Sequence, residues 1–241
     1  MPAIDILYRD DALVAINKPA GMPVHRSQMV NDAPHYLVDV LREQLGGKVL
    51  LAHRLDRATS GVLLVARSNE VAAALGAQFM QRTVHKRYLA VVRGWPEPAE
   101  GVVDYPLPGA RETGPRHDAR TRYRRLAMVE VPIALGRYPQ QRYALVEATP
   151  ETGRFRQIRK HLAHLHYPII GDCQHGRSDH NRLFKQHFAC HRMLLHAWQL
   201  EFAHPVSGAP MTLHAPLDAD FAAIVARFGW STALPPPSHG G

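Results

Sequence analysis

Apolar and polar residues alternate along several short stretches of the chain, a pattern typical of half-buried β-strands. "IDILY" and "LVAINKP" are two such stretches on either side of a turn at Asp10–Asp11, and "VHKRYLAVVRG", "TRYRRLAMVEV" and "RYALVEATP" follow later. "GVLLVA" at 61–66 is a continuous apolar run, short enough for a buried strand. "LHAWQLEFAHPVSGAPMTLHAP" predicts a hairpin that turns at Ser207–Gly208.

Three other stretches place apolar residues at helical spacing. "HYLVDVLREQLGG" has them at 37, 40, 41 and 45, and Gly46–Gly47 ends the pattern. "SNEVAAALGAQFMQR" begins with a capping Ser68 or Asn69. "RFRQIRKHLAHLHYP" has apolar residues at 158, 162 and 165 and ends at Pro168. This mixture of strands and helices predicts an α+β protein.

The segment from Gly94 to Asp118 is rich in proline and glycine. It predicts either a domain linker or a long binding loop, and the arginines that follow favour a loop that contacts nucleic acid. We expect residues 1–230 to form a single domain. Residues 231–241 contain "LPPPSHGG", and we expect them to be a disordered tail.

The charge of the chain narrows the function. Its 241 residues include 29 Lys and Arg against 21 Asp and Glu, a formal net charge of +8, which favours a polyanionic partner such as nucleic acid. Six arginines lie between Arg111 and Arg125, and four cations lie between Arg154 and Lys160. Because the planar guanidinium can bind two phosphate oxygens at once, we interpret both clusters as phosphate contacts. A solvated surface is the alternative.

Other function classes find little support. No apolar run approaches the ~20 residues that span a bilayer, and the N-terminus is unlike a signal peptide, so we expect a cytoplasmic protein with no membrane partner. Cys173 and Cys190 do not make a disulfide framework. His161, His164 and His166 invite a zinc hypothesis, but no known ligand spacing completes it, so we expect no metal. Nucleotide-binding glycine motifs are missing too, and we expect no cofactor.

The stretch "HRLDRATSG" at 53–61 places one aspartate, Asp56, between Arg54 and Arg57. Two interpretations stay open on these residues alone: a salt-bridged turn, or a carboxylate kept ionised to act as a nucleophile or base. A carboxylate that is partly removed from water takes up a proton more easily, and a cation within a few Å favours its charged form again. Catalysis by Asp56 would therefore require a nearby cation.

Four stretches resemble the successive motifs of the RluA-type pseudouridine synthases, in that family's order and spacing. They are "INKPAGMPVH" (16–25), "HRLDRATSGVLLVA" (53–66), "KRYLAVVRG" (86–94) and "TGRFRQIRKHLAHLHYPIIGD" (152–172). The resemblance implies an isomerase that detaches uracil from its ribose, turns the base and rejoins it through C5, without cofactor or metal. It also implies an α+β fold, one catalytic domain built on a large mixed, mainly antiparallel sheet with flanking helices and a central basic cleft.

Within these motifs, three residues match active-site positions of the family. Asp56 matches the essential aspartate, which either attacks the ribose C1′ or removes a ribose proton to give a glycal-like intermediate. Arg159 matches the basic residue that pairs with this aspartate, and Ile158 beside it would line the pocket floor. Tyr88 matches the tyrosine that stacks on the uracil and helps to take the proton from C5. On the residues alone, Arg159 could instead solvate its helix and Tyr88 could pack in the core.

Further matches concern RNA contact. Arg54 matches the position whose side chain fills the space left by a flipped base, with a surface ion pair as the alternative. His53 shapes the same loop, and "NKPAG" (17–21) braces it from beneath. Arg156 stands where another polar residue commonly precedes Gln157, which leaves its contact with substrate open. The predicted substrate-binding residues are thus Arg54, His53, Ile158 and Arg156.

The resemblance extends to a substrate. "PVHRS", "VVRGW", "YPIIGD" followed by "QHG", and "RFGW" are similar to a narrower group that modifies uridine-65 of certain tRNAs. We therefore expect tRNA as the RNA partner, with rRNA or another tRNA position as the alternative. The chain begins almost directly at "IDILYRDD", so we expect no S4 RNA-binding domain and a monomer whose catalytic domain selects the RNA.

Two other classes of function compete with this one. A non-catalytic RNA-binding module or chaperone would share the charge, but it has no reason to retain Asp56, Tyr88 and Arg159 together. A retaining glycosidase-like hydrolase would need a second carboxylate ~5 Å from the first. No acidic residue of the matched motifs is expected to play that part.

Overall fold

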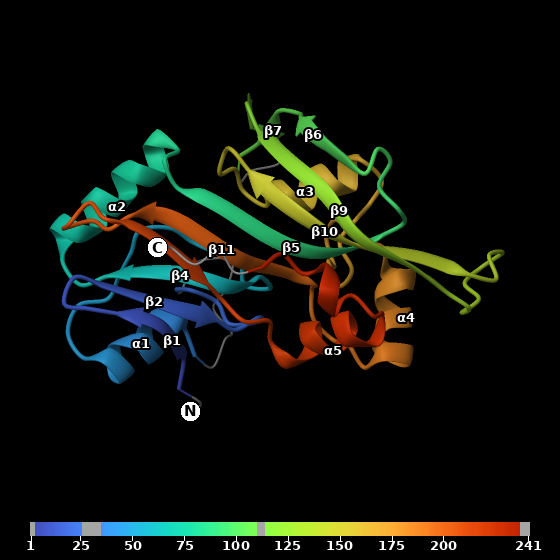
Figure 1. Ribbon diagram of the computed structural model, residues 1–241, viewed down its shortest axis with the longest axis horizontal. Helices are drawn as coiled ribbons and strands as arrows, with labels where there is room; N and C mark the ends of the chain where they lie inside the picture. Colours follow the sequence, from blue (N-terminus) through green and yellow to red (C-terminus); the bar gives the residue numbers. More distant parts are fainter. Residues whose placement is uncertain (1–2, 26–34, 110–113, 237–241) are drawn as a thin grey trace. The chain divides into compact units, whose positions relative to one another are not determined.

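The computed structural model describes residues 3–25, 35–109 and 114–236 (Figure 1). The chain divides into two compact units. Unit 1 contains residues 1–86 and 196–217. Unit 2 contains residues 87–195 and 218–236. Residues 237–241 lie outside the described part of the chain. The predicted active-site residues are divided between them. Asp56 belongs to unit 1, while Tyr88 and Arg159 belong to unit 2.

Unit 1 is built on a mainly antiparallel sheet. Its strands follow the order β1 (Asp5–Arg9), β2 (Leu13–Lys18), β4 (Ser60–Ala66) and β11 (Leu195–Ala203), of which β4 and β11 run parallel. The short β3 (Leu50–Leu51) pairs with β4, and β12 (Pro210–His214) pairs with β11. Every residue of β4 is buried, which confirms the buried strand predicted at 61–66. The predicted turns at Asp10–Asp11 and Ser207–Gly208 are confirmed as well.

Gly61, the second residue of β4, packs closely against the backbone of β11. It lies opposite Ala197 of β11, and a Cβ on Gly61 would come within 2.2 Å of the Ala197 carbonyl oxygen. Its φ of +111° is also a conformation that side chains rarely adopt. A glycine is therefore required here, and this close contact fixes the C-terminal end of the loop that carries Asp56.

The two helices of unit 1 agree with the helical periodicity of the sequence. In α1 (Leu37–Leu45) the four residues predicted at its apolar face are buried, and Gly46 follows at a φ of +65°. The next helix, α2 (Asn69–Gln81), begins at Ser68, whose side-chain oxygen accepts a hydrogen bond from Val71 N–H. It packs against β3 and β4.

Unit 2 contains a second run of antiparallel strands. Their order is β5 (His85–Arg93), β10 (Gln141–Pro150), β9 (Arg120–Val131) and β6 (Glu100–Asp104). The pair β7 (Leu107–Pro108) and β8 (Arg116–His117) forms separately. The first two residues of β5 belong to unit 1, so the chain passes from one unit to the other within this strand.

The prediction of one long loop from Gly94 to Asp118 is wrong, because β6, β7 and β8 lie in this segment. Proline and glycine suggested a loop, yet Gly101 lies inside β6. A Cβ on Gly101 would come within 3.0 Å of the Tyr123 hydroxyl, so the tyrosine ring on the neighbouring strand occupies the space that a side chain would take. Residues 110–113, including Arg111, lie outside the described residues.

Helices α3 (Gln157–His164), α4 (Ser178–Phe188) and α5 (Ala219–Arg227) complete unit 2, followed by the short 3₁₀ helix η1 (Ser231–Ala233). The first of these packs against β9 and β10 (Figure 1). A cluster of aromatic rings joins α4 and the end of α5 to β10. Its members are Tyr143, Phe184, Phe188, Phe228 and Trp230.

The predicted fold class is confirmed: the protein is α+β, with mixed but mainly antiparallel strands and flanking helices. The single domain over 1–230 and the central basic cleft stay predictions. The predicted tail at 231–241 includes η1, and its last residues, 237–241, lie outside the described part of the chain.

Candidate active site

Asp56 lies in the loop between β3 and β4, where it begins a tight turn. Its carbonyl oxygen accepts a hydrogen bond of 3.0 Å from Thr59 N–H. Its residue surface is half-buried, whereas Leu55 and Thr59 on either side of the turn are buried. The turn thus presents Asp56 at the boundary between the interior of unit 1 and solvent.

A buried lysine braces this loop. Lys18, at the end of β2, is 0% exposed, and its Nζ donates hydrogen bonds to three carbonyl oxygens: Pro19 at 2.8 Å, Arg57 at 3.1 Å and Thr59 at 2.9 Å. Gly21 adds two further bonds to Arg57, one through its N–H and one through its carbonyl oxygen. The prediction that residues 17–21 brace the loop from beneath is confirmed, with Lys18 as the central contact.

His53 anchors the other end of the loop. Its Nε2 accepts a hydrogen bond of 2.9 Å from Leu64 N–H, and its ring stacks on Phe79 with centroids 4.5 Å apart. Burial, with a smaller contribution from Lys86, lowers the pKa of His53 to about 3. The ring is therefore neutral at physiological pH. Its predicted contact with RNA stays a prediction, whereas its contribution to the shape of the loop is direct.

Arg54 lies two residues before Asp56 and is exposed. An exposed cation at the base of the loop has the position expected of a side chain that enters RNA beside a flipped base. Its role there stays a prediction.

Tyr88 lies near the start of β5 and is opposite Ala148 of β10. It is half-buried, while the next residue, Leu89, is fully buried. Successive strand residues point to opposite faces of a sheet, so Tyr88 and Arg87 lie on different faces. Arg87 forms an ion pair with Glu147 at 2.6 Å on its own face. Tyr88 is thus not enclosed in the core, and its contact with uracil stays a prediction.

The start of α3 is fixed by a buried amide. The Oε1 atom of Gln157 accepts hydrogen bonds from Thr152 and Arg154, and its Nε2 donates to the Arg120 carbonyl and the Thr121 hydroxyl, all within 2.6–2.9 Å. Gln157 thereby joins the start of the helix to β9. The residues that follow it in the sequence, including Arg159, are held in place by this connection.

Arg159 is buried and forms a bidentate ion pair. Its Nε and Nη2 atoms donate to the two carboxylate oxygens of Asp172, each at 2.7 Å, and Nη2 also lies 3.2 Å from the Gln174 Oε1. The side chains are 7% and 1% exposed. Burial alone would raise the pKa of Asp172, but hydrogen bonds from Arg159 and from two backbone N–H groups outweigh burial and lower it. The alternative that Arg159 merely solvates its helix is wrong.

Ile158 and Arg156 flank this pair on the chain. Ile158 is 7% exposed, as expected of a residue on an apolar floor. Arg156 precedes the helix in a left-handed conformation, with a φ of +56°, and its guanidinium lies 4.4 Å from the ring centroid of Phe155. Both contacts with RNA stay predictions.

The histidines of α3 have structural partners. His161 is fully buried, and it contacts the Thr121 hydroxyl at 2.9 Å and the Tyr105 carbonyl at 3.0 Å. Burial is the main cause of its lowered pKa. His164 is exposed and stacks on the Tyr105 ring, with centroids 3.9 Å apart. Over residues 3–25, 35–109 and 114–236, no group of three His, Cys, Asp or Glu side chains could hold a metal ion.

The arginines of the first basic cluster are partly neutralised. Arg120, Arg122 and Arg124 alternate along β9 and form an arginine ladder with exposed side chains. Glu151 pairs with the first two, and Glu147 pairs with the third. Because each glutamate lies against the ladder, this face carries less net positive charge than the sequence suggests. Its predicted phosphate contacts stay a prediction.

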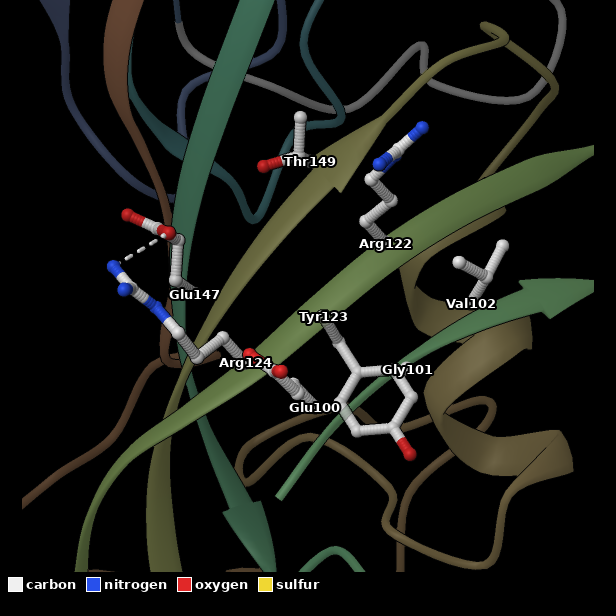
Figure 2. Close-up of a pocket in the computed structure, with 8 residues that line it drawn as sticks. All are labelled: Glu100, Gly101, Val102, Arg122, Tyr123, Arg124, Glu147 and Thr149. Carbon is white, nitrogen blue, oxygen red and sulfur yellow. Dashed lines mark hydrogen bonds and ion pairs between the residues drawn. The ribbon is translucent and has the colours of Figure 1, made fainter. Parts of the chain in front are cut away.

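A hollow of about 500 Å³ lies over this part of unit 2. Figure 2 shows the residues that line it, with Arg124 reaching toward Glu147. Strands β6, β9 and β10 form it. None of the seven predicted site residues lines it. The lining residues are Glu100, Gly101, Val102, Arg122, Tyr123, Arg124, Glu147 and Thr149.

The structure brings six of the seven predicted residues together in two groups, and the seventh, Tyr88, lies on β5. His53, Arg54 and Asp56 share one loop of unit 1, and Arg156, Ile158 and Arg159 share the start of α3 in unit 2. The pairing of Arg159 with Asp56 stays a prediction, since the two belong to different units.

One residue with a direct structural role was missed from the sequence, and the contact of another was predicted only in part. The motif at 17–21 placed Lys18 in the segment that braces the loop, but no local pattern indicates that its side chain makes the contact. Asp172 had a signal: it is the one acid of the motif that contains Arg159, and a buried arginine requires an acidic partner.

Residues 12–164 match the sequence model of the RNA pseudouridylate synthase family, and the chain belongs to this family.

No helix in the described part of the chain has the length and apolar character needed to cross a membrane.

Curated relatives give a more specific likeness. The chain is 47% identical over 241 residues to tRNA pseudouridine synthase C of Salmonella typhi, with 96% of this chain and 92% of that protein covered. It is equally identical to tRNA pseudouridine synthase C of Pectobacterium carotovorum subsp. carotovorum, but spans only 64% of the length of that relative. The protein of this name from Vibrio cholerae is 44% identical, with 96% and 98% of the two chains covered.

Solved structures agree on the fold. The human RNA Pseudouridylate Synthase Domain Containing 4 superposes with a TM-score of 0.72 at 27% identity, covering 93% of each chain. The human RNA Pseudouridylate Synthase Domain Containing 1 gives 0.71 at 23% identity, covering 89% of this chain and 83% of the other. The second likeness concerns the fold alone.

Proposed function

We propose that this protein converts uridine-65 of tRNA into pseudouridine, acting as a monomer in the cytoplasm. The observation that carries the proposal is the structure of the Asp56 loop. The carboxylate at the position of the family's aspartate is half-buried, and buried Lys18 binds the backbone carbonyl oxygens of Arg57 and Thr59 in the same loop. Relatives named tRNA pseudouridine synthase C, up to 47% identical over 96% of the chain, support tRNA as the substrate.

In this proposal Asp56 acts on the ribose of the target nucleotide. Its carboxylate either attacks C1′ as the uracil leaves, or removes a ribose proton so that a glycal forms. Either step needs an ionised carboxylate that is fixed relative to the sugar. The bonds from Lys18 Nζ and from Gly21 N–H to carbonyl oxygens of the loop fix the backbone on which Asp56 lies.

Tyr88 and Arg159 complete the proposed chemistry. Tyr88 stacks on the detached uracil while the base turns, and it helps to remove the proton from C5. Arg159 keeps the carboxylate of Asp56 charged, since a guanidinium stays protonated throughout the physiological range. Arg54 enters the space left by the target base, because a base inside a stacked helix must be flipped out before its C1′ can be reached.

The direct test uses the purified protein and an unmodified tRNA transcript. We expect pseudouridine to form at position 65 and nowhere else, as mapped by chemical probing of the product. A matched transcript with cytidine at position 65 serves as the control and should yield none. Product at another position would replace uridine-65 as the target, and no product in any tRNA or rRNA would refute the proposed function.

A further inference from the structure

The buried ion pair of Arg159 and Asp172 fixes the orientation of the Arg159 guanidinium. A bidentate pair holds the guanidinium plane in one orientation, because two parallel hydrogen bonds leave no freedom to rotate. These bonds use Nε and Nη2. Since the guanidinium is planar, they also set the direction in which its remaining nitrogen, Nη1, points.

Asp172 is itself held from three directions. Its Oδ1 accepts hydrogen bonds from the backbone N–H groups of Gln174 and His175, at 2.9 and 3.1 Å. Its carbonyl oxygen accepts a bond of 2.9 Å from the side chain of Asn181 on α4. The same asparagine accepts a bond of 2.7 Å from Gly171 N–H. Asp172 therefore cannot follow Arg159 if that side chain moves; it is the fixed member of the pair.

The preceding glycine adds to this rigidity. A Cβ on Gly171 would come within 2.1 Å of the Arg192 carbonyl oxygen, and its φ is +82°. The turn that carries Asp172 is thus packed directly against the backbone near residue 192. A turn that is held this rigidly can also fix the orientation of Arg159, whose side chain is hydrogen-bonded to Asp172.

The pair is also costly to bury. Removing two charges from water opposes folding, and a buried pair of this kind can often be replaced by apolar residues without loss of stability. Its presence in the same motif as the proposed catalytic arginine therefore calls for a role beyond stability.

We propose that Asp172 is a positioning residue, which orients the guanidinium of Arg159 for the reaction. This inference rests on the proposed function, in which Arg159 keeps the reacting carboxylate charged. Asp172 does not touch the substrate; it acts through Arg159 alone.

The test is Asp172→Asn in the full-length protein, assayed with tRNA. Asparagine keeps the size of the side chain, but its amide cannot accept both hydrogen bonds from Arg159. We expect kcat to fall by about 100-fold, as for a misplacement of about 1 Å, while KM for tRNA stays within about twofold. Asp179→Asn is the matched control, because this carboxylate pairs with exposed Arg177 a few residues further on, and it should leave kcat unchanged.

A double-mutant comparison separates positioning from a structural role. If Asp172 acts only through Arg159, Arg159→Met combined with Asp172→Asn should be no slower than Arg159→Met alone. Each single variant leaves one charge buried without its partner, so urea denaturation first checks that all three variants fold. If Arg159→Met does not fold, Arg159→Lys, which keeps a cation against Asp172, takes its place in the comparison. A further loss of activity in the folded double variant would overturn the inference, as would an unchanged kcat in folded Asp172→Asn. If the wild-type protein forms no pseudouridine, the proposed function fails instead.

Discussion

The loop of Asp56 and the start of α3 are held in opposite ways. The loop is fixed through its backbone, where Lys18 binds carbonyl oxygens of Arg57 and Thr59, and Asp56 itself lies half-buried. Arg159 on α3 is fixed through its side chain, whose guanidinium is sealed against Asp172. In the proposed function the two groups have different tasks. Asp56, which would react with the substrate, is held through the backbone of its loop, and Arg159, which would supply positive charge, is held through its own side chain.

The largest expected effect is at Asp56. Asp56→Asn removes the carboxylate but keeps the turn, because the turn depends on the backbone carbonyl of this residue. We expect pseudouridine formation to fall on the order of 10⁴-fold, as is common when a reacting group is removed, with tRNA binding near normal. Turnover and filter binding on one preparation measure both. Asp11→Asn, an exposed acid in another turn, is the control, and comparable turnover in both variants would exclude Asp56 from the chemistry.

A smaller effect is expected on stability, at Lys18. Lys18→Met leaves three carbonyl oxygens without their charged donor, and we expect a loss of about 4 kcal/mol in the free energy of unfolding, with weaker activity. Urea denaturation measures the loss. Lys48→Met, at an exposed lysine, should change stability by less than about 0.5 kcal/mol. Equal stability of the two variants would show that the loop does not depend on Lys18.

The smallest expected effect is a pH dependence at His53. The pKa of this ring is lowered from 6.5 to about 3 in the folded protein. Its contribution to stability is therefore complete above about pH 6.5 and is lost as the pH falls toward 3, because the unfolded chain takes up the proton first. We expect this acidification to lower the free energy of unfolding by about 2 kcal/mol, a value reduced to allow for the partial exposure of His53.

His53→Gln should reduce this acid sensitivity, since its amide oxygen can accept the Leu64 bond and does not titrate in this range. Unfolding measured between pH 7 and pH 4 tests the difference, with His85→Gln, at an exposed histidine, as the control. The same pH dependence in wild type and His53→Gln would show that His53 is not held neutral by the fold.

Local patterns predicted much of this protein. Helical spacing identified α1, α2 and α3, and a continuous apolar run identified β4, because burial of these elements depends on residues close together in the chain. The loop of Asp56 and the helix of Arg159 were found through motifs that are equally local. The composition of residues 94–118 misled, since an edge strand such as β6 tolerates glycine when a neighbouring ring fills the space.

Long-range contacts were not accessible in this way. The motif at 17–21 predicted that this segment braces the loop, but not which side chain does so. The bonds from Lys18 join residues that are about forty positions apart, and alternation within β2 predicts only that Lys18 lies on one face. Likewise, the charges counted between Arg111 and Arg125 gave no sign of Glu147 on the adjacent strand β10 or of Glu151 just after it, which pair with the arginine ladder. Pairing across strands depends on register, which local sequence specifies poorly.

The central claim is that this protein makes pseudouridine in tRNA by means of Asp56. The most direct measurement maps pseudouridine in tRNA from cells that lack the gene and from the same cells carrying either the wild-type gene or the Asp56→Asn variant. The account predicts that pseudouridine at position 65 disappears in the deletion strain and returns with the wild-type gene only. Pseudouridine that persists in the deletion strain, or that returns with Asp56→Asn, would contradict it.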